Sequence, residues 1–242
     1  MHKFLLLALF SALTVAVPAS AQTMSLDLGQ EGSLTLQSLQ ILALITVLSL
    51  VPGIAIMVTC FPFIVTVLAI LRQGIGLQQS PPNMLMVSLA LFLTYFVMEP
   101  VFIDAYEAGV RPVIEGTMSA EGGFSAAMVP LRGFMSARLD PDTFAELASL
   151  RSLEISTGNA ADAPLSVLIP SFMLSEIARA FQVGFVLFLP FLIIDLVVAA
   201  VLMSMGMMMV PPAIVSLPFK LAFFVVADGW ALIASSLVRS YS

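Results

Sequence analysis

Long apolar runs alternate with short polar segments along this chain, and the polar segments predict where its helices turn. No charged residue occurs between Glu31 and Arg72, a run of 40 residues. One straight helix of that length would be about 60 Å long, twice the roughly 30 Å of a bilayer core. Pro52, Gly53 and Pro62 lie inside the run. They indicate a kinked or broken helix; the alternative is one ordinary span beside an interfacial helix.

The polar segment 72–83 is rich in Gly, Gln and Pro, a composition typical of a turn. A second apolar run follows it and ends near residue 103. We therefore expect a first helical hairpin over residues 41–103, with its turn at 72–83.

The middle of the chain is acidic and predicts an exported helical region over residues 104–180. Nine acids and four arginines lie within residues 104–162. Apolar residues spaced three or four apart indicate an amphipathic helix over 121–138. That stripe consists of Phe124, Met128, Leu131 and Met135. Asp140 followed by Pro141 predicts a capped start of the next helix.

The most apolar part of the chain predicts a second helical hairpin over residues 181–238. Only three charges occur between residues 169 and 212, namely Glu176, Arg179 and Asp195. The expected spans cover about 181–203 and 213–238, and a methionine-rich turn at 206–212 joins them.

Composition then sets the class of protein. Hydrophobic residues make up 60% of the 242 and charged residues 10%, whereas soluble domains have about 45–50% and about 25%. We predict an all-α, polytopic membrane-type protein. Fifteen acids oppose nine bases, which argues against a nucleic-acid partner and leaves membrane lipid as the expected surroundings. With one cysteine, one histidine and no catalytic motif, we predict no enzyme activity, no cofactor and no metal site.

The first residues are typical of a cleaved signal peptide over residues 1–21. A basic start precedes an apolar run and the cleavage pattern Ala19-Ser20-Ala21. The alternative is a short first membrane helix. Residues 22–40 would then be an exported segment and residues 239–242 a tail. In the resulting topology Arg72 is the only base in the inner loops, so the positive-inside rule does not support conventional spans.

Asp195 lies in the middle of an expected span, where a carboxylate must face a partner or a cavity. If the hairpin folds at residues 210–212, the rise per residue of a helix places Asp195 and Asp228 at about the same distance from the turn. Lys220 would lie nearer to the turn than either. We therefore expect Lys220 not to meet Asp195 within one hairpin. A contact between subunits, a pore-lining role and a proton relay all remain open for Asp195.

Glu176 and Arg179 are three residues apart and face the same side of a helix. They form either a local surface pair or a contact with neighbouring subunits near a pathway.

Three consecutive methionines, Met207, Met208 and Met209, occupy the turn of the second hairpin between Gly206 and two prolines. Methionine is flexible and adapts to varied shapes. The turn is either an apolar loop packed in a core or a hydrophobic gasket around a channel.

Several of these segments together resemble the FliP family, the flagellar biosynthesis export-gate component, which is related to the R component (SctR) of virulence type III secretion. The similar segments are 76–83, 89–94, 170–185, 190–196, 205–212, 216–220 and 228–230. The expected signal peptide and the ending Ser240-Tyr241-Ser242 favour the flagellar branch.

The resemblance implies an all-helical, non-enzymatic subunit of the type III export gate in the bacterial inner membrane and flagellar basal body. Five copies would assemble with FliQ and FliR and other export-apparatus proteins into a helical pore that passes unfolded flagellar proteins. The family's methionine gasket would fall on Met207, Met208 and Met209, with polar contacts at Glu176, Arg179, Asp195, Lys220 and Asp228. Helices raised out of the bilayer plane would explain the failed charge rule. The alternative function is a proton-coupled small-solute transporter that uses Asp195.

Overall fold

The computed structural model describes residues 33–77, 80–151, 160–207 and 209–241. Over these ranges every regular element is a helix, which confirms the all-α prediction. The expected signal peptide and the first part of the exported segment lie outside the described residues. The chain divides into two compact units, residues 1–49 and 50–242.

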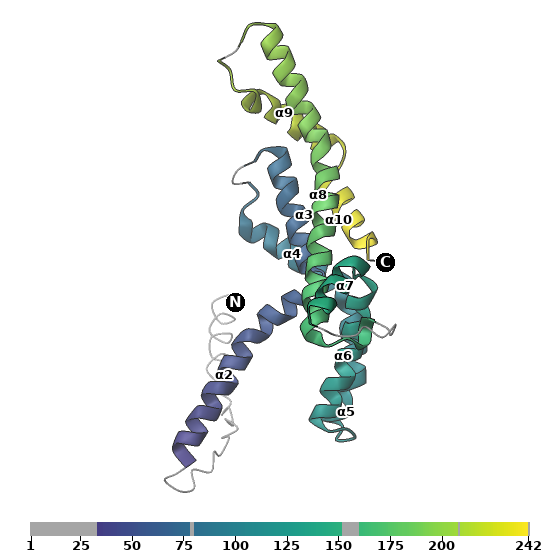
Figure 1. The fold of residues 1–242 in the computed structure, drawn as a ribbon. Coiled ribbons are helices and arrows are strands. Elements are labelled where there is room, and N and C mark those ends of the chain that lie inside the picture. The colour runs from purple at the N-terminus through teal and green to yellow at the C-terminus, as the bar shows by residue number, and fades with distance from the viewer. Residues whose placement is uncertain (1–32, 78–79, 152–159, 208, 242) are drawn as a thin grey trace, which may run out of the picture. The chain divides into compact units, whose positions relative to one another are not determined.

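The helices follow one another without a strand in the part of the chain that the structure describes (Figure 1). They are α2 (Ser33–Met57), α3 (Phe61–Ile75), α4 (Asn83–Ala105), η1 (Tyr106–Val110), α5 (Arg111–Ile114), α6 (Ala120–Ala137), α7 (Pro141–Leu150), η2 (Ala160–Asp162), α8 (Leu165–Ser204), α9 (Pro212–Val226) and α10 (Gly229–Arg239). Three stretches are long and apolar enough to cross a membrane: Ser38–Met57, Asn83–Ile114 and Leu165–Ser204. The helices α9 and α10 together form a fourth candidate, bent by 62°.

The charge-free run at the start is broken, as its prolines predicted. Helix α2 begins at Ser33, earlier than the expected residue 41, and ends at Met57. Helix α3 starts at Phe61, after three intervening residues, with Pro62 in its first turn. Proline is tolerated there because that position has no intrahelical hydrogen bond to lose. Helix α3 ends at Gly76, whose φ of 87° is the left-handed cap conformation.

Helix α3 lies at the centre of the main core of residues 50–242. Its buried side chains recur three or four residues apart, which is the pattern of one helix face. They include Phe63, Ile64, Val67, Leu68 and Leu71, each 0–1% exposed. The helix packs mainly against α8.

The predicted exported region contains the two helices that the sequence indicated. The amphipathic helix is α6, and the Asp140 side chain caps α7 by accepting a 2.9 Å hydrogen bond from the Thr143 N–H. The Arg132 guanidinium fixes the chain before α8 by donating to the carbonyls of Ala161 and Ala163, at 2.9 and 2.7 Å.

Helix α8 is 40 residues long and continues through residue 180, where we expected the exported region to end. At 1.5 Å per residue it is about 60 Å long, roughly twice a bilayer core. In Figure 1 it is the long green helix, and α9 folds back from its end. The expected boundary between residues 180 and 181 lies within this one helix, which also carries the paired side chains of Glu176 and Arg179. Charges limit the stretch that fits in hydrocarbon, but they do not end a helix when they are paired.

The expected span over 213–238 consists of two helices, because α9 ends at Val226 and α10 begins at Gly229. Asp228 between them has a φ of 46°. A Cβ on Gly229 would lie 2.2 Å from the Phe224 ring, so this close approach requires a glycine. The chain therefore bends sharply at Asp228.

Candidate functional site

The methionine-rich turn begins with a defined helix stop at the end of α8. The Gly206 N–H donates to the Met203 carbonyl at 3.1 Å, and the Met207 N–H donates to the Leu202 carbonyl at 2.9 Å. With Gly206 at a φ of 76°, these two bonds form a Schellman motif. Pro211 and Pro212 then start α9, since proline fits the first helical position.

Two methionines of this turn, Met207 and Met209, are exposed in the single chain. Met207 is 43% exposed and Met209 is 97% exposed. Met208 lies outside the described residues. Met203 and Met205, just before the turn, are each 61% exposed. Of the two alternatives, packing of the turn in the core of its own chain does not fit these exposures.

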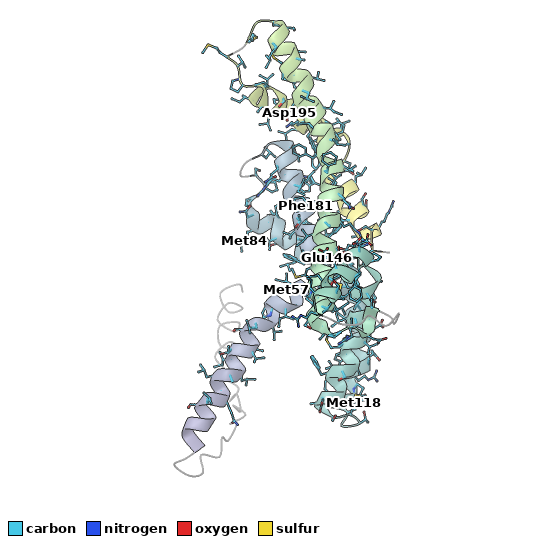
Figure 2. The ribbon with its side chains drawn as sticks, viewed as in Figure 1. Met57, Met84, Met118, Glu146, Phe181 and Asp195 are labelled. Carbon is cyan, nitrogen blue, oxygen red and sulfur yellow. The ribbon has the colours of Figure 1, made fainter. Side chains whose placement is uncertain are left out.

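Below the turn, Asp195 of α8, which Figure 2 labels, contacts side chains of α9. Its Oδ2 accepts a 2.6 Å hydrogen bond from the Lys220 ammonium, and its Oδ1 accepts one of 2.6 Å from the Ser216 hydroxyl. The Lys220 Nζ also donates to the Gly74 carbonyl at 3.0 Å. That carbonyl lies in the last turn of α3, where the helix dipole favours a cation. We call Asp195, Ser216, Lys220 and the Gly74 carbonyl the Asp195 cluster.

The expectation that Lys220 does not reach Asp195 is therefore wrong. Asp195 lies nine residues before α8 ends at Ser204, and Lys220 lies eight residues after α9 begins at Pro212. The two residues are thus at nearly the same height above the turn. The error came from counting the turn residues as if they added helical rise.

Asp228 does not lie at the same height along the hairpin as Asp195, although we expected it to. It is exposed at the bend between α9 and α10, and its side chain does not cap α10. Because α9 ends before Asp228, this residue does not lie on the helix that packs against α8. Repulsion between Asp195 and Asp228 within one chain therefore has no structural basis.

A second polar cluster surrounds Glu176, which is completely buried. The Arg138 Nε donates to Glu176 Oε1 at 3.0 Å, and the Arg179 Nη1 lies 3.6 Å from the same oxygen. The Tyr241 hydroxyl donates to Oε2. We call Glu176, Arg138, Arg179 and Tyr241 the Glu176 cluster. The predicted pair of Glu176 and Arg179 exists, but Arg138 makes the shorter contact.

The other members of these clusters, Ser216, Arg138 and Tyr241, were not predicted from the sequence. Ser216 could have been found, since it precedes Lys220 by one helical turn and shares its face. Arg138 and Tyr241 are 38 and 65 residues from Glu176. Periodicity within one helix carries no information about contacts at that separation.

The geometry provides a hairpin with an exposed methionine turn, which the partly buried Asp195–Lys220 ion pair joins to the end of α3. Within the described residues, no group of three or more His, Cys, Asp or Glu side chains could hold a metal ion. An apolar groove of about 490 Å³ runs between α8 and α9 next to the turn. These features can seal and pack against apolar surfaces.

Comparison with known proteins agrees with this arrangement. The model of the FliP family matches residues 44–237. The chain is 49% identical to the flagellar biosynthetic protein FliP of Caulobacter vibrioides, over all of this chain and 92% of that protein. It is 44% identical to the protein of that name from Agrobacterium fabrum, covering 96% and 97% of the two chains. For the Bacillus subtilis protein the identity is 43%, over 84% and 92%. The chain therefore belongs to the FliP family.

Proposed function

We propose that this chain is a pore-forming subunit of the flagellar type III protein export gate. In this proposal it passes unfolded flagellar proteins across the bacterial inner membrane within the basal body. Five copies, together with FliQ and FliR, surround the passage. The relatives' shared name, flagellar biosynthetic protein, supports the flagellar setting.

The observation that carries the proposal is the exposed methionine turn at the tip of an apolar hairpin. A side chain that is 97% exposed, such as Met209, gains nothing from the core of its own chain. Repeated around an axis, several such turns would place flexible thioethers in one ring. That ring would close around chains of varied shape and still block ions.

The Asp195 cluster supports the same proposal by holding the hairpin in place. Lys220 is 5% exposed and contacts both the carboxylate on α8 and the end of α3. A gasket requires turns at fixed positions, and these contacts set the position of each hairpin within its subunit.

The proton-coupled transporter is less well supported by this geometry. Both carboxylate oxygens of Asp195 already accept hydrogen bonds from Lys220 and Ser216. These donors come from the same chain and hold the carboxylate in one place, whereas a proton carrier needs a carboxylate oxygen that is open to the proton pathway. Under the transporter hypothesis, Asp195→Asn abolishes coupled transport; under the gate hypothesis, it disturbs assembly at most.

The test replaces Met207, Met208 and Met209 together with alanine in the assembled complex. We expect the complex to keep its size in mild detergent and to leak ions at several times the background conductance. The matched control replaces three exposed methionines outside the turn, Met57, Met84 and Met118, which Figure 2 labels. Background conductance of the turn variant in a normally sized complex would contradict the gasket.

A further inference from the structure

The two oxygens of the buried Glu176 carboxylate have different partners. Oε1 is bonded by Arg138 at 3.0 Å and lies 3.6 Å from Arg179. Among the described residues, only the Tyr241 hydroxyl bonds Oε2. A buried anionic oxygen that loses its donor bears its full desolvation cost. The stability of the ion pair therefore depends on Tyr241.

Tyr241 follows α10 and is held by rings from two other helices. Its ring stacks on Phe134 of α6 at 6.0 Å and meets Phe63 of α3 edge-on at 5.6 Å. The Arg138 guanidinium lies over the Tyr241 ring at 4.0 Å. Arg138 Nη1 also donates to the Ser240 carbonyl at 2.7 Å. The residues after α10 are thus joined to α3, α6 and α8.

Apolar packing of α10 at this place is incomplete, which gives these polar contacts more weight. A cleft of about 230 Å³ remains between α10 and the side chains of α3 and α8, and Ser240 lies at its edge. Phe63, Leu187 and Leu237 are among the residues that line it. Where side chains leave such a gap, dispersion contacts are lost.

Tyr241 is suited to act as the donor at all ordinary pH values. Burial, followed by the nearby Glu176 charge, raises the pKa of the Tyr241 phenol above its usual value. The hydroxyl therefore remains protonated and can donate to the carboxylate.

We propose that Tyr241 is a positioning residue that fixes the Glu176 carboxylate and thereby holds the end of α10 at the junction of α3, α6 and α8. The assignment is independent of the proposed export function, because it concerns contacts within one chain. It gives a role to residues that, from the sequence, belonged to a short tail.

The experiment measures the unfolding temperature of the full chain in mild detergent. Tyr241→Phe removes the hydroxyl and keeps the ring, and we expect it to lower the unfolding temperature by about 5 °C. Tyr95→Phe is the matched control, since Tyr95 is 61% exposed on α4 and its change should have no effect. Tyr241→Ala, which also removes the ring contacts, should lower the temperature further.

Removing the charge of Glu176 distinguishes this role from one in which Tyr241 contributes only the packing of its ring. In a Glu176→Gln background, Tyr241→Phe should lower the unfolding temperature by less than half as much as it does in the original chain. The reason is that no anionic oxygen then remains without a hydrogen-bond donor. An equal shift in both backgrounds, or no shift for Tyr241→Phe, would overturn the assignment. If Tyr241→Phe does not fold, recovery by Glu176→Gln supports the assignment, and failure to recover refutes it.

Discussion

Helix α8 carries two carboxylates in ion pairs, and the surroundings of the two differ. Glu176 is completely buried, and its partners come from the end cap of α6, from α8 itself and from the segment after α10. The Asp195 side chain is 33% exposed, and its side-chain partners come from the adjacent helix α9. The residues are 19 positions apart, or about 28 Å along the helix.

The difference shows which pair can tolerate the loss of a partner. One third of the Asp195 side chain is accessible in the single chain, so its charge is less desolvated than that of Glu176 when Lys220 is removed. Glu176 has no such access, and an unpaired charge there remains in a low-dielectric interior. We therefore expect the Glu176 cluster to contribute to the stability of the fold, while the Asp195 cluster mainly orients the hairpin.

The largest expected effect is that of Arg138→Ala. This change removes the shortest ion contact of Glu176 and the cation over the Tyr241 ring. We expect the free energy of unfolding to fall by about 3–5 kcal/mol, the usual cost of breaking a buried pair on one side. Denaturant titration in mild detergent, followed by circular dichroism, measures it.

Arg111→Ala is the matched control for that prediction. Arg111 also pairs with two acids, Glu107 and Glu115, but all three side chains are more than half exposed. Exposed pairs of this kind contribute at most about 1 kcal/mol. Equal losses for Arg111→Ala and Arg138→Ala would show that burial does not separate the two cases.

Lys220→Met should have an intermediate effect. Methionine keeps the apolar stem but removes the ammonium from Asp195 and from the Gly74 carbonyl. Because Asp195 is partly exposed, we expect a loss of about 1–3 kcal/mol in the free energy of unfolding, smaller than for Arg138→Ala. The same denaturant titration measures it.

The double variant with Asp195→Asn separates the charge from the shape of the Asp195 cluster. If the cost of Lys220→Met arises from an unpaired carboxylate, Asp195→Asn should restore part of the lost stability. A loss for Lys220→Met as large as that for Arg138→Ala would remove the contrast between the two clusters.

The sequence predicted what depends on neighbours along the chain and failed where distant segments meet. The Asp140 cap and the helix stop at Gly206 use residues within five positions of one another, so their types and order predict them. The Glu176 cluster joins residues far apart in the chain, and no pattern in any one helix indicates Arg138 or Tyr241. The Asp195–Lys220 pair was predicted only in part. Both residues were identified as polar contacts, but their contact with each other was missed because the turn residues were counted as helix.

The smallest expected effect concerns pH at the edge of the Glu176 cluster. Asp140 is linked to that cluster by its backbone N–H, which donates to the Ser175 hydroxyl at 2.9 Å. The Thr143 N–H and then the Thr143 hydroxyl hold the pKa of the Asp140 carboxyl below its usual value, and Arg179 adds a smaller contribution. Because the pKa of Asp140 is lower in the folded state, the ionised carboxylate stabilises the fold at pH values above the ordinary carboxyl pKa near 3.8. This stability is lost as the pH falls through the pKa of the folded state.

Asp140→Asn keeps an oxygen that can cap α7 but removes the titrating group. We therefore expect the variant to show a slightly smaller drop in unfolding temperature than the original chain between pH 6 and pH 3. The comparison isolates Asp140, because every other acid titrates in both proteins. Identical pH profiles would mean that the Asp140 cap contributes no proton-linked stability.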